Sequence, residues 1–392
     1  MIYKRKIYSN LLKHAKSPMV TVLTGMRRTG KTTLVKQLLL DLDNKNSLYL
    51  DLQRPDNREL FLQKNYDSIY EAFISRGLSK NKPMIVALDE IQLAPDSPSA
   101  IKYLFDNKKI KFIVTGSSSY YLKNLFTESL SGRKKLFELY PLDFGEFLTF
   151  KEVNFTQTSW QKKTFNKAEY DRLCSYYEEY IRYGGFPQVV LAQSAESKKD
   201  ILWDIISSYI NIDIRSIADF ADIQNLFSLA KLLASRIGSR TEYSTLSKLI
   251  GVSRPTVTNY VSFFEKTYLI RNVPIFTKNS SKEVSKIKKT YFCDTGLANR
   301  LADLSSGSQF ENTVFNQLSQ VGDIKYFSLK KGNEIDFILN SSLAIEAKET
   351  PTTNDVQSLS RLSAVAEIPD FCVVSRRETP RFKNYIWGGS IT

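Results

Sequence analysis

The stretch GMRRTGKTT, residues 25 to 33, has glycine, lysine and threonine at a spacing that suits a polyphosphate. Gly25, Gly30, Lys31 and Thr32 satisfy the pattern G-x-x-x-x-G-K-[ST]. In this pattern the glycines let backbone N–H groups surround phosphate oxygens, the lysine reaches the β- and γ-phosphates, and the hydroxyl ligates magnesium. The pattern therefore predicts a bound nucleoside triphosphate with Mg²⁺. We expect its contacts to come from Gly25, Arg28, Thr29, Gly30, Lys31, Thr32 and Thr33.

An acidic pair ends the apolar run PMIVALDE at residues 83 to 90. Asp89 and Glu90 follow the pattern of a buried strand, and the carboxyl ends of such strands are where α/β sheets bind ligands. We expect Asp89 to hold the metal ion through water and Glu90 to orient or activate the attacking water. Asp89 alone could also cap a helix, but beside a phosphate loop the pair indicates hydrolysis.

Two further polar positions adjoin later strands. The run KIKFIVTGSSS ends in small polar residues, so Ser117 or Ser118 is a candidate sensor of the γ-phosphate, with an ordinary turn as the alternative. Arg133 precedes another strand and is a candidate to stabilise charge on the γ-phosphate, from the same chain or from a neighbouring subunit. A solvated loop arginine is the other interpretation of Arg133.

A second set of charged residues lies in GNEIDFILNSSLAIEAKET, residues 332 to 350. Two alternating strands joined by a three-residue turn would pair apolar with apolar residues and place Asp336 opposite Glu346, with Cβ atoms about 5 Å apart. Lys348 falls on the same face. A one-residue slip would bury the carboxylates, so the hydrophobic pattern fixes an acidic face.

Two carboxylates and a lysine held in this way predict a divalent-metal site with a basic group that positions or activates water. Glu311, in an upstream helix, adds a further carboxylate. The spacing D-x(9)-E-x-K is typical of restriction-endonuclease-like phosphodiesterases, so Asp336, Glu346 and Lys348 are candidate catalytic residues. A degenerate site in a structural or binding domain is the alternative.

The nucleotide site requires elements that position it, and the first 148 residues supply an alternation of strands and helices. This order predicts an α/β fold, with a parallel sheet covered by helices on both faces. The predicted strands are 19–24, 47–52, 83–89, 110–116 and 135–139, and the predicted helices are 31–40, 66–76 and 99–107.

From about Thr149 the pattern becomes helical and aromatic. Glycine and proline at residues 184 to 187 break a helix. Gly185 and Pro187 could press their backbone on an adenine from a helical lid, or they could form a plain turn between helices. Residues 222–277 read as helices, a tight turn and short strands, which predicts a winged helix-turn-helix. Such a module binds DNA or packs against protein.

Composition narrows the class of protein. The chain has 392 residues, 42% of them hydrophobic and 24% charged, which is typical of globular domains. We find no run of about 18 apolar residues and no secretory signal, and the three scattered cysteines predict reduced thiols in a cytoplasm.

The net charge is +14, and residues 221 to 290 hold twelve Lys or Arg against four Asp or Glu. This basic block favours a polyanionic partner, with a merely solvated surface as the alternative.

Nearly the whole chain resembles prokaryotic AAA-type ATPases that carry a C-terminal domain of unknown function with an endonuclease-like fold. The resemblance is carried by GMRRTGKTTL, ALDEIQ, VTGSSS, LSGR, YPLDFGEF, YGGFP, the winged-helix run, YFCDTGLANRL, FENTVFNQL, GNEIDF and AIEAK. It implies ATP rather than GTP, and a kinship with signal-transducing ATPases that use a G-x-P element near the base. It also implies nucleotide-site roles for Gly25, Gly30, Lys31, Thr32, Asp89 and Glu90, and nuclease-like roles for Asp336, Glu346 and Lys348.

These observations predict four domains: an ATPase core at 1–148, a helical lid at 149–220, a winged helix at 221–284 and an endonuclease-like domain at 285–392. The first hypothesis is a Mg²⁺-dependent ATPase that moves the last two domains on DNA, with a second divalent metal at Asp336 and Glu346. The second is a slow ATP-driven switch that engages a protein partner. Both allow an oligomer, and neither needs a membrane.

Overall fold

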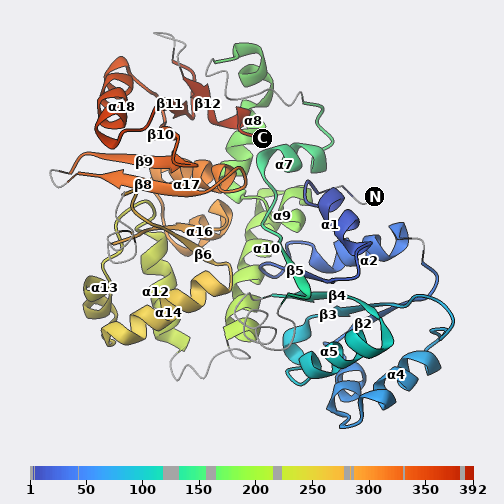
Figure 1. Cartoon of the computed structure of the whole chain (residues 1–392). Helices are drawn as coiled ribbons and strands as arrows, with labels where there is room; N and C mark the ends of the chain where they lie inside the picture. The colour runs from blue at the N-terminus through green and yellow to red at the C-terminus, as the bar shows by residue number, and fades with distance from the viewer. Residues whose placement is uncertain are drawn as a thin grey trace. The chain divides into compact units, whose positions relative to one another are not determined.

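The computed structural model describes residues 3, 5–42, 44–117, 132–155, 165–214, 223–277, 283, 287–329, 332–379 and 385–392. The chain divides into two compact units, shown with their elements in Figure 1. The first unit is Met1–Tyr140 with Lys266–Tyr268, and the second is Pro141–Glu265 with Leu269–Thr392. None of the helices in these described ranges combines the length and apolar composition that a membrane span requires. The predicted boundaries at 148, 220 and 284 stay predictions.

The first unit is built on one five-stranded sheet in the order β2-β3-β4-β1-β5, and all neighbouring strands are parallel. The predicted parallel sheet is therefore confirmed, and every predicted strand agrees within two residues. The strands are β1 (Val20–Thr24), β2 (Ser47–Asp51), β3 (Ile85–Asp89), β4 (Lys111–Gly116) and β5 (Lys134–Glu138).

Helices cover both faces of this sheet, because its central strands are apolar on both sides. Val22 packs with one layer and Leu23 with the other, as the alternation of strand side chains requires. Burial of each such side chain contributes roughly 1.5–3 kcal/mol. One layer contains α1 (Tyr8–Ala15) and α2 (Lys31–Asp41), and the other contains α3 (Pro55–Glu59), a 3₁₀ turn (Leu60–Leu62), α4 (Tyr66–Ser75) and α5 (Ser97–Lys108).

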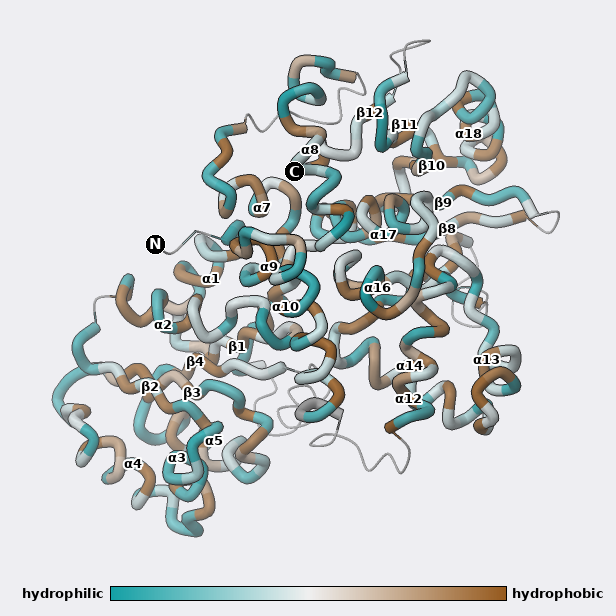
Figure 2. Tube along the Cα trace, turned by 180° about the vertical axis from the view of Figure 1, so that it is seen from behind, coloured by the Kyte–Doolittle hydropathy of each residue, from teal (hydrophilic) through white to brown (hydrophobic). Residues whose placement is uncertain are grey.

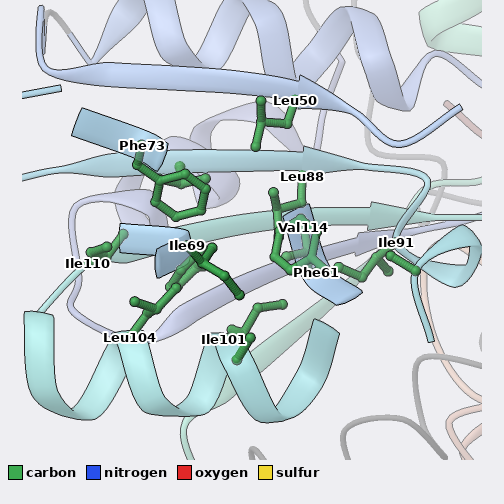
Figure 3. Packing of buried hydrophobic residues seen from close by; sticks show 14 of the residues in the cluster. Leu50, Phe61, Ile69, Phe73, Leu88, Ile91, Ile101, Leu104, Ile110 and Val114 are labelled. Carbon is green, nitrogen blue, oxygen red and sulfur yellow. The ribbon is translucent and has the colours of Figure 1, made fainter. Parts of the chain in front are cut away.

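Figure 3 shows the second of these layers from close by. Ile101 and Leu104 point from α5 toward Leu88 and Val114 of the sheet, and Phe73 joins them from α4. In Figure 2 brown and teal segments alternate along α4, as an amphipathic helix on a core requires. The sequence prediction omitted α3, a short helix that starts at Pro55, because five residues are too few to show a helical period.

The second unit begins with helices. They are α7 (Phe144–Phe150), α8 (Lys167–Tyr183), α9 (Pro187–Leu191), α10 (Ala195–Ser208) with a π-helical turn (Tyr209–Ile214), α12 (Ile223–Ala234), α13 (Tyr243–Ile250) and α14 (Arg254–Lys266). Gly251 ends α13 in the left-handed region, and the Ser253 hydroxyl accepts the Thr256 N–H at 3.2 Å. The strands β6 (Ile270–Val273) and β7 (Lys289–Phe292) then pair antiparallel. The predicted helices and turn are present and β6 lies in the predicted strand segment, but its partner β7 lies beyond residue 284, outside the predicted module. The identity of this region as a winged helix stays a prediction.

The second sheet has the order β12-β11-β10-β9-β8, antiparallel from β8 to β10 and parallel from β10 to β12. Pairing of Leu339 with Leu343 and of Phe337 with Ile345 confirms the predicted hairpin register. The elements are α16 (Thr295–Leu301), α17 (Ser306–Leu318), β8 (Ile324–Ser328), β9 (Glu334–Leu339), β10 (Leu343–Lys348), α18 (Thr353–Ala366), β11 (Asp370–Ser375), β12 (Ile386–Trp387) and a 3₁₀ turn (Gly388–Ser390).

One part of the hairpin prediction is wrong. The predicted acidic face would leave the carboxylates out of the core, but Asp336 is only 8% exposed. The sheet is covered on both sides, because the even-numbered residues Ile338 and Ala344 are buried with α18 while Phe337 packs against Phe315 of α17. The acidic side chains therefore need partners inside the protein.

Candidate functional site

The phosphate loop joins β1 to α2 at the carboxyl edge of the first sheet. Two of its glycines are required by the backbone. Gly30 has φ +101°, in the left-handed half of the map, and a Cβ on Gly25 would collide with the carbonyl oxygen of Leu139. The first turn of α2 follows at once, with Lys31 and Thr32 in it. The predicted strand, loop and helix are thus present in the order that phosphate binding needs.

Lys31 is held inside the loop. Its ammonium donates to the carbonyl oxygens of Gly25 at 2.8 Å and Met26 at 3.0 Å, and the residue is 4% exposed. The Thr29 hydroxyl donates to the same Met26 oxygen at 2.9 Å. The Arg5 guanidinium binds the Thr29 oxygen at 3.0 Å, which braces the loop from the N-terminal segment.

The other two predicted contacts, Arg28 and Thr33, are exposed beside this buried core of the loop. Arg28 has φ +64°, a left-handed conformation that is unusual for a residue with a Cβ. Their contacts with a nucleotide stay predictions.

Asp89 receives three hydroxyl donors from three neighbouring elements. Thr32 Oγ1 of α2 lies 2.7 Å from its Oδ2, Tyr49 Oη of β2 lies 2.6 Å from the same atom, and the Thr115 hydroxyl of β4 donates to Oδ1. Among the described residues, none forms an ion pair with Asp89. Burial and the hydrogen bond to Asp89 raise the pKa of Tyr49, so its phenol stays a donor.

This donor set suits magnesium. A carboxylate and a hydroxyl oxygen within hydrogen-bond distance of each other, beside a phosphate loop, are the hard oxygen ligands that Mg²⁺ combines with phosphate oxygens and water. Thr32 and Asp89 would hold the ion.

Glu90 follows in the left-handed region, with φ +60°, and its N–H donates to Thr115 Oγ1 at 3.0 Å. Its carboxylate accepts a hydrogen bond from the Gln92 amide and lies 3.7 Å from the Arg27 guanidinium. The same Gln92 nitrogen donates to Ser117 at 3.0 Å. The structure therefore brings Ser117 to Glu90 through Gln92, while Ser118, the alternative candidate, lies outside the described residues.

The structure does not bring Arg133 to this edge of the sheet. Lys134 pairs with Val20, the first residue of β1, so Arg133 lies at the amino edge, whereas the phosphate loop follows the last residue of β1. Its guanidinium pairs with Asp106 at 3.0 Å. A role in its own phosphate loop is wrong for this arrangement, and a role in a neighbouring subunit stays a prediction.

Gly185 has partners within the second unit. Its N–H donates to Asp294 Oδ2 at 2.7 Å, and its carbonyl accepts the Leu142 N–H at 2.7 Å. Asp294 also caps α16 by accepting the Leu297 N–H at 3.0 Å. Pro187 begins α9, where a missing N–H costs nothing. The adenine contact of Gly185 and Pro187 stays a prediction, while their role at the turn between α8 and α9 is established.

The C-terminal carboxylates surround a lysine that the sequence prediction did not include. The ammonium of Lys289 lies 2.9 Å from Glu334, 3.7 Å from Asp336 and 3.9 Å from Glu311. Its side chain is 1% exposed. Burial acts to lower its pKa, but the three carboxylates outweigh burial and the pKa is raised, so Lys289 is a cation. Tyr291 donates to Glu311 at 2.7 Å.

Glu346 and Lys348 form a separate pair, 2.8 Å apart. Burial, followed by the nearby Asp336, raises the pKa of Glu346 to about 8, and the same two causes raise that of Glu311 to about 7. The N–H of Ala347 donates to Asp336 at 3.0 Å. Within the described ranges, no three His, Cys, Asp or Glu side chains come together in a way that would hold a metal ion.

Comparison with known proteins gives two family matches. Residues 17–148 match the family described as "AAA domain", and residues 174–308 match the family described as "Domain of unknown function (DUF8612)". Each match covers about a third of the chain. The second spans Gly185, α12 to α14 and Lys289.

Several relatives are themselves uncharacterised. The chain is 27% identical to uncharacterized protein MJ1544 of Methanocaldococcus jannaschii, over 82% of this chain and 72% of that protein. It is 26% identical to an uncharacterized protein of Haemophilus influenzae, over 86% and 84%.

A solved structure, AMPPCP-bound DnaA from Aquifex aeolicus, aligns with 66% of this chain and 86% of its own, at 14% identity and a TM-score of 0.28. The match over residues 17–148, together with the parallel sheet and phosphate loop, identifies the N-terminal part of the chain as a P-loop ATPase domain of the AAA type.

Proposed function

We propose that the chain binds ATP with Mg²⁺, hydrolyses it, and couples the nucleotide state to a second unit that binds DNA. The observation that supports hydrolysis most directly is the 2.7 Å hydrogen bond between Thr32 and Asp89. It joins the phosphate loop to the acidic end of β3, which supports a nucleotide–metal site at this edge of the sheet. Glu90 lies next to Asp89 and supplies the base that hydrolysis needs.

Each residue then has a defined task. Lys31 exchanges its two carbonyl acceptors for β- and γ-phosphate oxygens, which carry more negative charge. Thr32 and Asp89 would hold Mg²⁺, which would neutralise charge on the phosphate oxygens. Glu90 is released by Gln92 and Arg27 to orient the attacking water. Gln92 also contacts Ser117, so a change at the γ-phosphate reaches the end of β4 through hydrogen bonds.

Coupling between the units is supported by the path of the chain. Lys266–Tyr268 belongs to the first unit, although the rest of α14 before it and β6 after it belong to the second. The Tyr268 hydroxyl donates to Glu138 of β5 at 3.2 Å, and its ring meets that of Tyr140 with centroids 5.9 Å apart. A movement of β5 would therefore pull on the end of α14 through only a few covalent bonds.

The proposed DNA contact is the exposed side of α14. Arg254, Thr258 and Asn259 are exposed, while Val257 and Tyr260 are buried against the rest of the unit. A helix that follows a tight turn and shows basic and polar side chains to solvent can contact phosphates and base edges. The net charge of +8 over residues 221 to 290 supports attraction to the DNA backbone.

Steady-state hydrolysis tests the nucleotide site. Replacement Lys31→Ala should lower ATP turnover by roughly 100-fold or more, because the γ-phosphate loses its main counter-charge. Lys102→Ala, an exposed lysine of α5, is the control and should be unchanged. Equal turnover in Lys31→Ala and the wild type would disprove the site assignment.

DNA binding is tested separately by fluorescence anisotropy at increasing salt. A steep loss of affinity with salt, weakened in Arg254→Ala, supports the DNA contact. Absence of binding at low salt would leave the ATPase in place and favour a protein partner for the second unit.

A further inference from the structure

The carboxylate cluster of the second unit contains a cation supplied by the chain. Glu311 comes from α17, Glu334 and Asp336 come from β9, and Lys289 comes from β7, a strand of a different sheet. Four side chains from three elements thus meet at one ammonium. This convergence requires the folded unit, because Lys289 precedes Asp336 by 47 residues in the chain.

A divalent metal at Asp336 does not fit this arrangement. Asp336 uses Oδ1 to face Lys289 at 3.7 Å and Oδ2 to accept the Ala347 N–H at 3.0 Å, so both oxygens are already engaged. Glu346, the other carboxylate of the D-x(9)-E-x-K spacing, pairs with Lys348 at 2.8 Å. A dication placed between them would meet the field of two ammonium groups, and like charges in a buried place repel strongly.

We propose that Lys289 takes the place that an endonuclease-like fold gives to a divalent metal, so that this unit carries an internal cation and does not cleave phosphodiesters with Asp336. The ammonium neutralises part of the negative charge of Glu311, Glu334 and Asp336. It also ties β7, the strand that pairs with β6, to β9 of the C-terminal sheet. The inference is independent of the nucleotide chemistry proposed above.

The ion-pair network around Lys289 is buried, so it should contribute to the stability of the second unit. The Lys289 side chain is 1% exposed, and its ammonium lies over the ring of Tyr326, 5.7 Å from the ring centroid. A buried ammonium with three carboxylate partners has its desolvation offset, whereas its removal leaves buried carboxylates that repel one another. A surface lysine would produce neither effect, since exposed pairs contribute little.

Titration of the full-length wild-type chain with Mn²⁺, without nucleotide, is the first test. By calorimetry, the wild type and Asp336→Asn should bind Mn²⁺ equally, with no site that depends on Asp336. In a nuclease assay, the wild type should show no Mn²⁺- or Mg²⁺-dependent cleavage of single-stranded, double-stranded or branched DNA. Either a binding signal or a cleavage activity that is present in the wild type and absent in Asp336→Asn would overturn the proposal.

The second test removes the internal cation with Lys289→Met, which keeps the length and the apolar stem of the side chain. The melting temperature should fall by roughly 10 °C, and Mn²⁺ should then bind and restore part of it, because the carboxylates lack a counter-charge. The restored part should disappear in the double variant with Asp336→Asn. Lys288→Met is the matched control, since Lys288 is its half-exposed neighbour on the chain.

A folded Lys289→Met chain that is as stable as the wild type, or that does not bind Mn²⁺, would show that Lys289 does not fill a metal position. If Lys289→Met fails to fold while Lys288→Met folds, the wild-type titration decides alone. In that titration Asp336-dependent Mn²⁺ binding counts against the proposal, and its absence supports it.

Discussion

Asp89 and Asp336 are both buried aspartates on strands of a sheet, and they differ in the partners that surround them. Asp89 accepts hydrogen bonds from three neutral hydroxyls, those of Thr32, Tyr49 and Thr115. Asp336 faces the ammonium of Lys289 at 3.7 Å and accepts one backbone N–H. Neutral donors orient a carboxylate without cancelling its charge, whereas an ammonium cancels it.

This difference separates an acid that is ready for a metal from one that is already neutralised. Around Asp89 a dication would meet a carboxylate held by a fixed set of neutral hydroxyl dipoles. Around Asp336 a dication would compete with a covalently attached cation that never leaves. The same residue type therefore points to metal chemistry at the carboxyl end of β3 and to internal pairing inside β9.

Removal of each carboxylate is the strongest test of the comparison. Asp89→Asn should lower ATP turnover by roughly 100-fold, because the Mg²⁺ ligand loses its charge while its shape is kept. Asp336→Asn should change basal ATP turnover by less than about twofold, since it removes no group from the nucleotide site. Both are measured as steady-state phosphate release at saturating Mg²⁺. An Asp336→Asn chain as inactive as Asp89→Asn would break the comparison.

Asp294 extends the comparison, because it is fully buried and its described partners are the backbone N–H groups of Gly185, Gly296 and Leu297. Burial raises its pKa from 3.8 to about 6, and these hydrogen bonds only partly oppose the shift. The folded state therefore binds the proton more tightly than the unfolded state. Stability from this group is present below about pH 4 and is lost as the pH rises through about 6.

Asp294→Asn should remove this loss of stability with rising pH. Between pH 4 and 6.5 the free energy of unfolding of the wild type should fall by up to about 3 kcal/mol relative to the variant, as a shift of two pKa units requires. Urea unfolding at four pH values measures it, with Asp303→Asn, an exposed acid of the same unit, as the control. Parallel pH profiles for wild type and Asp294→Asn would contradict the raised pKa.

Much of the first unit could be predicted because its signals are local. The phosphate loop, the β1 pattern before it and the acidic end of β3 lie in short contiguous runs, and a parallel sheet brings carboxyl ends to one edge. The same rule would have placed Arg133 correctly. Arg133 precedes its strand, while Lys31 follows one, so the two belong to opposite edges of a parallel sheet.

The partners of the acids could not be predicted in the same way. Tyr49 is the single aromatic residue of β2, and the pairing of β2 with β3 brings its hydroxyl to Asp89. Lys289 reads as one of several lysines in a basic run, and its burial among carboxylates depends on how β7 meets β9 and α17. Tertiary placement, rather than residue type, separates these two from their neighbours.

Tyr49 offers the most sensitive test of the three neutral hydroxyl donors around Asp89. Tyr49→Phe removes one hydroxyl donor but keeps the ring on which the Lys36 ammonium rests, 4.9 Å from the centroid. With one donor fewer, Asp89 has more rotational freedom, so the Mg²⁺ concentration for half-maximal ATP turnover should rise about tenfold, as for partners behind a metal ligand. Turnover at saturating Mg²⁺ should change by less than about threefold, because no reacting group is lost. Tyr103→Phe, which removes an exposed hydroxyl that hydrogen-bonds Asp67 at 3.2 Å, should leave both values unchanged. A Tyr49→Phe chain with the wild-type Mg²⁺ dependence would mean that Thr32 and Thr115 alone position Asp89.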